Sequence, residues 1–158
     1  MKDRARFWIL VANSSFAELY SVNNHNEMER LQSFDFPEGR LKSGEVNSDR
    51  PGRSHASVGT KRHAYETKIN VHTHEQQKFA GQLAHVLIAG NEQGLFERLA
   101  LVCPPEFLGE LRLLLPENLK RNIYKELPKD LPGHLTELAR IEQLYKMLDI
   151  SRPSAASR

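Results

Sequence analysis

The apolar residues among the first 36 positions fall into three short runs separated by polar turns. The run Phe7–Ala12 is almost continuously apolar, as expected of a strand that is buried on both faces. After a turn rich in Asn and Ser, Phe16–Val22 reads as the returning strand of a hairpin. Residues 28–36 follow as a third, more amphipathic strand, in which Leu31 and Phe34 are the expected core positions. The pattern predicts an antiparallel meander of three strands.

The apolar spacing changes to that of a helix in the middle of the chain. The helix is predicted to begin near Thr73, because Gln76 stands three residues on, as in a capping box. Gly90 or Gly94 is expected to end it. Its apolar side chains recur at helical spacing on one stripe, at Phe79, Leu83, Val86 and Leu87.

Strand and helix patterns then alternate. Leu99–Cys103 is a short buried strand, and Pro104-Pro105 begins a second helix, at positions where proline is tolerated. Residues 122–127 alternate as a fifth strand, and a last helix is predicted over residues 133–148. The expected core positions of the two helices are Phe107, Leu108, Leu111, Leu114, Leu115, Leu135, Leu138, Ile141, Tyr145 and Leu148.

The order of these elements indicates an α/β fold. Three strands are followed by helix, strand, helix, strand and helix, a βββαβαβα order. A meander followed by right-handed crossover units gives a single mixed sheet with helices packed on it. Ribosomal S11/L18-like and ribonuclease-H-like folds share this order. We therefore predict one domain over residues 1–148 and a disordered tail over residues 149–158.

A long polar stretch from Pro37 to about Tyr65 separates the third predicted strand from the first predicted helix. Compact domains rarely hold a structureless connection longer than about 12–15 residues unless it is functional or disordered. This one has six basic and three acidic residues, a net charge of +3, whereas the whole chain has a formal charge of only +2.

A basic loop on a near-neutral body predicts contact with an anionic partner, and RNA or the ribosome is the expected one. Arginines hold phosphates through paired hydrogen bonds, and glycines allow the backbone to approach closely. A solvated, disordered insertion that binds nothing is the alternative. The predicted nucleic-acid-binding residues are the six cations of the loop: Arg40, Lys42, Arg50, Arg53, Lys61 and Arg62.

Composition narrows the class of protein. The single cysteine, Cys103, excludes an internal disulfide framework, so a reducing cytoplasm is the expected location. No apolar run approaches the roughly 20 residues of a membrane span. The first apolar run stops after about six residues, which is too short for a signal peptide. We expect neither membrane association nor DNA as a partner.

Several residues are candidates for catalytic or metal-binding groups, and none is assigned. His63, His72 and His74 match no helical zinc-site spacing. Cys103 ends a strand before a helix, where a thiol pKa can fall, but a small buried hydrophobe is the simpler interpretation. A hydrolytic set of Asp49, Ser54 and His55 has no identifiable oxyanion donor. The ribonuclease-H-like order would call for clustered acidic metal ligands, but Glu18 is the only acid on the first hairpin, so a two-metal nuclease is not predicted. No catalytic residue, metal or cofactor is therefore predicted.

Several segments together resemble one protein family. The strongest are Arg50-Pro-Gly-Arg-Ser54 and Pro104-Pro-Glu-Phe-Leu-Gly-Glu-Leu-Arg112. Trp8-Ile-Leu-Val-Ala-Asn-Ser-Ser15 and Arg62-His-Ala-Tyr-Glu66 add to them. The chain resembles, from about Arg6 to Leu148, the bacterial family of proteins required for attachment to host cells.

That family looks distantly similar to the middle domain of archaeo-eukaryotic peptide-release factors and their Pelota relatives. The resemblance implies a functional loop between the early strands and the long helix, the place of the basic stretch here. In the release factor that loop carries Gly-Gly-Gln, which is absent from this sequence. The resemblance therefore gives no catalytic residue.

Three hypotheses for function follow. The first is a non-enzymatic cytoplasmic module that binds RNA or the ribosome through the basic loop. The second, implied by the family resemblance, is a protein-interaction factor required for attachment to host cells. The third is a hydrolase of unknown substrate, for which no residue constellation has the right spacing.

Overall fold

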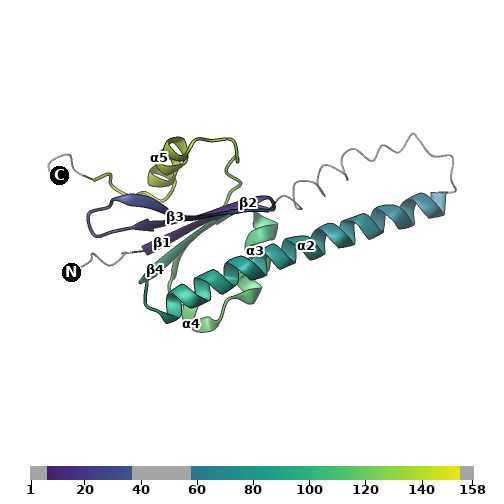
Figure 1. Ribbon diagram of the computed structural model, residues 1–158, viewed down its shortest axis with the longest axis horizontal. Coiled ribbons are helices and arrows are strands. Elements are labelled where there is room, and N and C mark those ends of the chain that lie inside the picture. The colour runs from purple at the N-terminus through teal and green to yellow at the C-terminus, as the bar shows by residue number, and fades with distance from the viewer. Residues whose placement is uncertain (1–6, 37–57, 154–158) are drawn as a thin grey trace.

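The computed structural model describes residues 7–36 and 58–153, and for residues 58–73 it describes the backbone alone. The described chain forms three layers (Figure 1). A sheet lies in the middle, α5 covers one face, and α2, α3 and α4 cover the other. Residues 37–57 of the loop predicted over residues 37–65, and the end of the predicted tail, lie outside the described residues. Residues 58–65 of that predicted loop belong to α2 instead.

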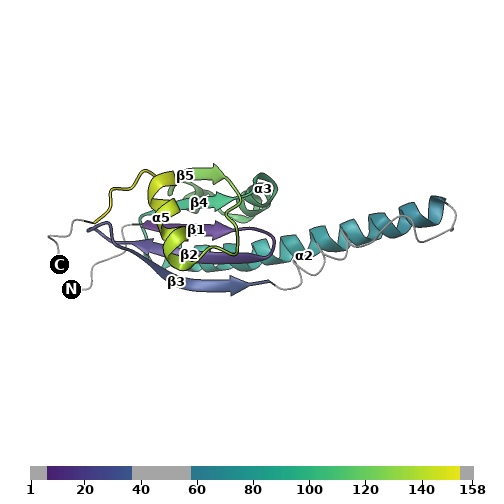
Figure 2. The same cartoon turned by 90° about the horizontal axis from the view of Figure 1, so that it is seen from above.

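Five strands in the described residues form one open mixed sheet in the order β3-β2-β1-β4-β5. The first three strands pair antiparallel, and β1, β4 and β5 run parallel (Figure 2). The strands are β1 (Phe7–Ala12), β2 (Phe16–Val22), β3 (Met28–Asp35), β4 (Arg98–Cys103) and β5 (Ile123–Pro128). The helices are α2 (Val58–Glu92), α3 (Pro105–Leu114), α4 (Glu117–Lys120) and α5 (Glu137–Met147).

The predicted fold class is confirmed: the protein is α/β, with one mixed five-stranded sheet. The predicted start of the long helix is wrong, because α2 begins at Val58 and not near Thr73. Thr73 is one of several polar residues inside this helix. No proline interrupts residues 58–92, so a continuous helix is sterically allowed there. The end of the helix agrees with prediction, since Gly94 adopts a left-handed φ of 67° just after α2.

The central strand β1 is buried along its whole length because both faces of the sheet are covered. Trp8, Leu10 and Ala12 pack into the core on the α2 side. Their neighbours in the strand belong to a second core on the α5 side, with Leu144 of α5. The unbroken apolar run that predicted this strand therefore fills two cores at once.

The end of α2 approaches β1 very closely at one point. A Cβ atom placed on Gly90 would lie 2.5 Å from Cζ3 and 2.6 Å from Cη2 of Trp8. The Trp8 ring also packs on Phe96, with ring centroids 4.7 Å apart. Further along α2, Phe79 stacks on Phe36 with centroids 4.7 Å apart and ring planes nearly parallel. These contacts set both the distance of α2 from the sheet and the direction of the helix axis across it.

A buried ion pair joins α5 to the opposite face of the sheet. Glu18 of β2 pairs with Arg140 of α5, and the two side chains are 4% and 5% exposed. Arg30 of β3 pairs with the second carboxylate oxygen of Glu18 at 2.9 Å. The Tyr20 hydroxyl donates a hydrogen bond of 3.2 Å to Glu18, and burial raises the pKa of Tyr20 to about 12, which keeps this donor protonated.

Arg140 also organises the chain that leads into α5. Its Nη2 donates to the carbonyl oxygens of Pro132, Gly133 and Leu135 at 3.2–3.3 Å. The guanidinium lies over the Phe16 ring, 4.9 Å from the centroid. The two Nη atoms of Arg140 are therefore paired with a carboxylate and carbonyl oxygens, as a low-dielectric interior requires, whereas its buried Nε has no hydrogen-bond partner among the described residues.

Three predicted core positions are wrong. Leu31 is 44% exposed because β3 is an edge strand, and a register shift opposite Leu19 and Tyr20 alters the alternation of its side chains. Leu138 is 77% exposed on the outer surface of α5, and Leu114 is 44% exposed at the end of α3. Phe34, the other predicted core residue of β3, is partly buried against the α2-side core.

The contact between Trp8 and Gly90 predicts an unusual response to substitution. Glycine-to-alanine changes inside helices ordinarily stabilise by about 0.5–1 kcal/mol. Gly90→Ala should instead lower the free energy of unfolding by roughly 1–3 kcal/mol, because Trp8 must move. Gly81→Ala in the same helix is the control, since its Cβ meets nothing within 4 Å. Urea unfolding of the two variants checks this, and equal effects would contradict it.

The buried ion pair predicts a non-additive pair of substitutions. Glu18→Leu or Arg140→Leu alone should lower the free energy of unfolding by about 3–5 kcal/mol, because each leaves a buried charge unpaired. The double variant should lose less than the sum of the two single losses, since neither charge remains. A double-mutant cycle by chemical unfolding measures this, and simple additivity would contradict the pairing.

Candidate functional site

The long helix α2 has two halves in different surroundings. Its 35 residues span about 52 Å at 1.5 Å per residue, whereas a strand of 6–8 residues spans roughly 20–27 Å. The half from Phe79 onward packs on the sheet, and its side chains Phe79, Ala80, Leu83, Ala84 and Leu87 are buried. The half before it extends beyond the sheet in both ribbon views (Figures 1 and 2). We call residues 58–75 the projecting half of α2.

Two of the six predicted nucleic-acid-binding residues fall in the projecting half. Lys61 and Arg62 lie three and four residues after the start of α2 at Val58, so they belong to a helix and not to the predicted loop. The other four, Arg40, Lys42, Arg50 and Arg53, lie outside the described residues. That these six cations act together remains a prediction.

The structure assigns Cys103 to the core. Its side chain is fully buried at the end of β4, and burial raises its pKa to about 12. A thiol of this kind is protonated at neutral pH and inaccessible to substrate. It therefore lacks both the thiolate charge and the exposure that a nucleophilic cysteine needs. The interpretation of Cys103 as a small buried hydrophobe is confirmed.

The described residues contain no metal-binding cluster. Among them, no group of three or more His, Cys, Asp or Glu side chains is arranged to hold a metal ion. His74 is exposed, whereas Asp49, Ser54 and His55 lie outside the described chain. Glu18, the acid on the first hairpin, forms ion pairs with Arg30 and Arg140, which occupy both of its carboxylate oxygens.

No helix in the described part of the chain is both long enough and apolar enough to cross a membrane.

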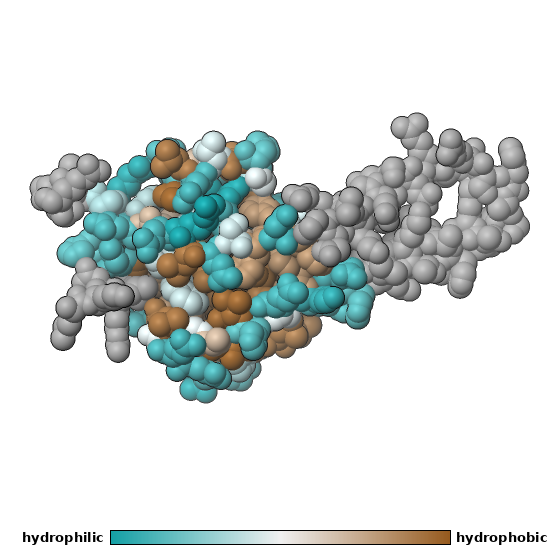
Figure 3. Space-filling model, viewed as in Figure 1, coloured by the Kyte–Doolittle hydropathy of each residue, from teal (hydrophilic) through white to brown (hydrophobic). Residues whose placement is uncertain are grey.

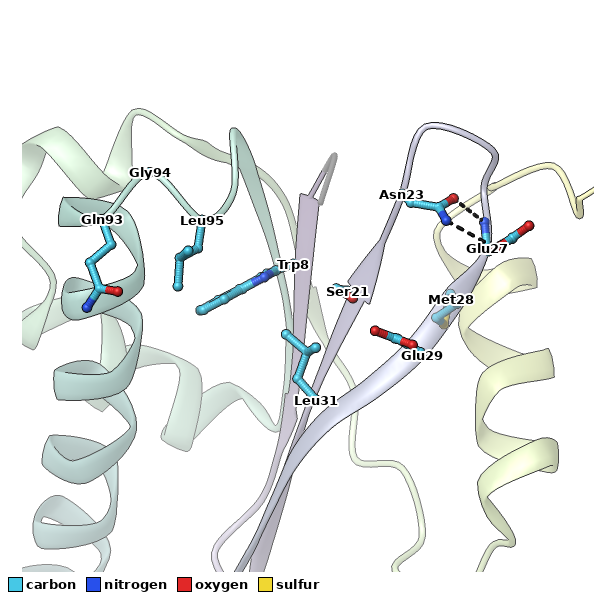
Figure 4. A pocket seen from close by; sticks show the side chains of 10 residues that line it. All are labelled: Trp8, Ser21, Asn23, Glu27, Met28, Glu29, Leu31, Gln93, Gly94 and Leu95. Carbon is cyan, nitrogen blue, oxygen red and sulfur yellow. Dashed lines mark hydrogen bonds between the residues drawn. The ribbon is translucent and has the colours of Figure 1, made fainter. Parts of the chain in front are cut away.

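A hollow of about 650 Å³ opens between the end of α2 and the edge strand β3. We call it the Trp8 hollow (Figure 4). Its volume lies within the roughly 300–1,000 Å³ typical of small-molecule sites. The residues that line it are Trp8, Ser21, Asn23, Glu27, Met28, Glu29, Leu31, Gln93, Gly94 and Leu95.

The hollow exists because α2 does not cover β3. Figure 3 shows apolar side chains gathered on this side of the molecule, between the sheet edge and α2. Leu31 and Leu95 are 44% and 45% exposed, and Figure 4 shows them flanking the Trp8 ring. Exposed apolar surface rimmed by polar residues is typical of a binding site.

Sequence reasoning missed this hollow, although one signal pointed to it. Ala17, Leu19 and Ser21 share the face of β2 that is turned toward α2, and Ser21 is a polar residue on this core face. A lone polar residue at a core position is the kind of exception that marks a functional hollow. The other half of the site comes from residues 93–95, which only the tertiary fold brings to β3.

The comparisons with known proteins point to one family. The sequence matches the family model described as "Protein required for attachment to host cells" over residues 8–140. No curated protein matches the chain.

Among solved structures, the crystal structure of the archaeal translation termination factor aRF1 is similar, with 11% sequence identity and a TM-score of 0.42. The match covers 90% of this chain and 39% of that chain. The protein therefore spans well under half the length of this neighbour.

The two halves of α2 predict different responses to proline, which removes one backbone hydrogen bond and clashes with the preceding turn. Gln82→Pro, in the packed half, should lower the free energy of unfolding by about 3 kcal/mol or more. Thr67→Pro, in the projecting half, should leave the cooperative unfolding of the body nearly unchanged, because this part of the helix lies beyond the sheet. Thermal unfolding of the two variants measures this difference. Similar losses in both would show that the whole of α2 is part of one packed unit.

Proposed function

The chain belongs to the family of proteins required for attachment to host cells, and on that premise we propose that it serves host association as a non-catalytic binding protein. Its proposed partner is RNA or the ribosome, and its proposed location is the cytoplasm. The observation that carries the proposal is the projecting half of α2, which extends beyond the sheet and includes the end of the basic stretch over residues 37–65.

A helix without a sheet beneath it needs another source of stability. In proteins, most of the stability of a helix comes from packing of one of its faces against other elements, and little comes from intrinsic propensity. The projecting half spans 18 residues and lies beyond the sheet. A partner that binds along it would add packing contacts and would favour the helical state.

The charge of this region favours an anionic partner. Four cations precede α2 in the sequence, and Lys61 and Arg62 continue the series inside its first turns. Arginine and lysine release counterions when they neutralise phosphates, so such binding weakens as salt rises. Arg50 and Arg53 flank Pro51-Gly52, a dipeptide typical of turns, which would present both guanidinium groups together.

The second candidate is a protein partner, which the family description favours because attachment to host cells is a contact between cells. The two candidates differ in their response to salt. Phosphate contacts give a log–log slope of about −0.7 to −0.9 per phosphate, whereas a protein contact without such charges changes little. Cell fractionation distinguishes a cytoplasmic protein from one at the cell surface. Recovery of the protein mainly in the medium or the outer envelope would favour direct attachment to host cells.

The proposal predicts the behaviour of Arg50→Ala combined with Arg53→Ala. Affinity for structured RNA or ribosomes should fall by roughly tenfold or more, because two charge-assisted contacts are lost. The salt slope should become shallower by about 1.4–1.8, which corresponds to two phosphates. The free energy of unfolding should change by less than about 0.5 kcal/mol, as for surface substitutions.

Arg121→Ala combined with Lys129→Ala is the matched control. Both residues are exposed, and they flank the edge strand β5, away from the basic stretch in the sequence. This control loses two positive charges, as the first variant does. Full RNA binding by this control, with weakened binding by the first variant, would support the proposal. Equal weakening by both variants would indicate attraction to net charge alone, and the basic stretch would lose its assignment.

A further inference from the structure

The geometry points to the Trp8 hollow as a binding site for an organic cation carried on an apolar arm. The ligand would have a protonated amine or guanidinium at one end and a short hydrocarbon portion at the other. This inference does not rest on the proposed function. The hollow lies at the C-terminal end of α2, and the projecting half lies at the other end of the same helix.

The charge lining the hollow has one sign. Glu27 and Glu29 are its only ionisable side chains, and no Lys, Arg or His lines it among the described residues. Figure 4 shows Glu27 directed away from Trp8 and held by Asn23, whose Nδ2 donates to it at 3.2 Å. Glu29 is directed toward Leu31 and Trp8 instead. Within the described part of the chain, Glu29 has no ion-pair partner, because the neighbouring Arg30 pairs with Glu18 and Glu137 on the other face.

An unpaired polar group marks the inner wall. Ser21 is only 7% exposed, and its side chain lines the hollow. Its hydroxyl makes no hydrogen bond to any other described residue. The hydroxyl opens into the hollow, where a donor or acceptor on a ligand can replace water and hydrogen-bond to it. Ser21 and Glu29 are cross-strand neighbours in adjacent strands, so one ligand group can reach both.

The remaining walls suit hydrocarbon. Leu31 and Leu95 flank the Trp8 ring, whereas the Met28 side chain packs against the α5-side core. An apolar arm laid between Leu31 and Leu95 would cover surface that water now contacts, which is favourable in proportion to its area. A neutral apolar ligand would desolvate Glu29 without pairing it, and an anion would meet two carboxylates. An amphipathic cation is the class of ligand that satisfies all of these groups together.

The protein carries its own reporter for this site. Trp8 is the single tryptophan of the chain and forms part of the lining, so its emission reports directly on occupancy. The probes share one six-carbon skeleton: hexylammonium, hexanol and hexanoate. Hexylammonium should give a saturable change in Trp8 emission, with an affinity about tenfold or more above that of hexanol. Hexanoate should bind more weakly than hexanol.

Glu29→Gln tests the charge and keeps the shape of the side chain. This variant should lose the preference for hexylammonium over hexanol and retain weak binding of both. Glu106→Gln, an exposed carboxylate on α3, is the control and should bind all three probes like the parent protein. Circular dichroism confirms that each variant is folded. Three outcomes would overturn the proposal: no saturable change with hexylammonium, hexanoate binding as tightly as hexylammonium, or an unchanged preference in Glu29→Gln.

A free amine and a lysine side chain of a peptide present the same group, and a second comparison separates them. Acetyl-leucyl-lysine amide represents the peptide, and spermidine represents a free amine. Tighter binding of the peptide supports the site as one for a protein segment, and tighter binding of spermidine supports it as one for a metabolite. If neither binds more tightly than acetyl-leucyl-glutamate amide, the proposal is wrong.

Discussion

The close approach of Trp8 to the backbone of Gly90 is the constraint on which the arrangement of this molecule depends. It brings the end of α2 down onto the central strand, and the stack of Phe79 on Phe36 sets the direction of the helix from there. Because the docking residues occupy only the second half of α2, the first half extends past the sheet. Because the helix is held over β1, the edge strand β3 keeps an open face, and the Trp8 hollow forms beside it. One packing contact thus accounts for both surfaces to which we assign binding.

On the other face of the sheet, α5 is held by ionic and polar contacts rather than by the packing of aromatic rings. Glu18 and Arg140 form a buried ion pair, and Arg140 also holds three carbonyl oxygens of the segment that leads into α5. Such a pair contributes little net stability compared with apolar packing, but breaking one half of it is costly. It fixes one position of α5 on the sheet. The acid that drew attention as a possible metal ligand is therefore a structural anchor.

Local patterns were enough to predict most of the fold. The continuous apolar run of β1, the polar turn after it and the Pro-Pro start of α3 each carry a local signal, and each prediction agrees with the structure. The start of α2 could not be predicted, because a Thr-x-x-Gln sequence inside a helix looks the same as one at its beginning. Leu31 and Leu138 were misplaced because exposure at an edge strand or an outer helix face depends on what covers them. The Trp8 hollow joins residues 8, 21 and 29 with residues 93–95, and no spacing along the chain indicates that juxtaposition.

The division of α2 into a packed half and a projecting half is the central claim, and amide hydrogen exchange along this helix tests it most directly. Amides of residues 79–92 should exchange slowly, through opening of the whole body, whereas amides of residues 61–73 should exchange much faster in the free protein. Addition of structured RNA should slow the second group and leave the first unchanged. Equal protection along the whole of α2 in the free protein, or fast exchange of residues 61–73 that RNA does not slow, would contradict the account.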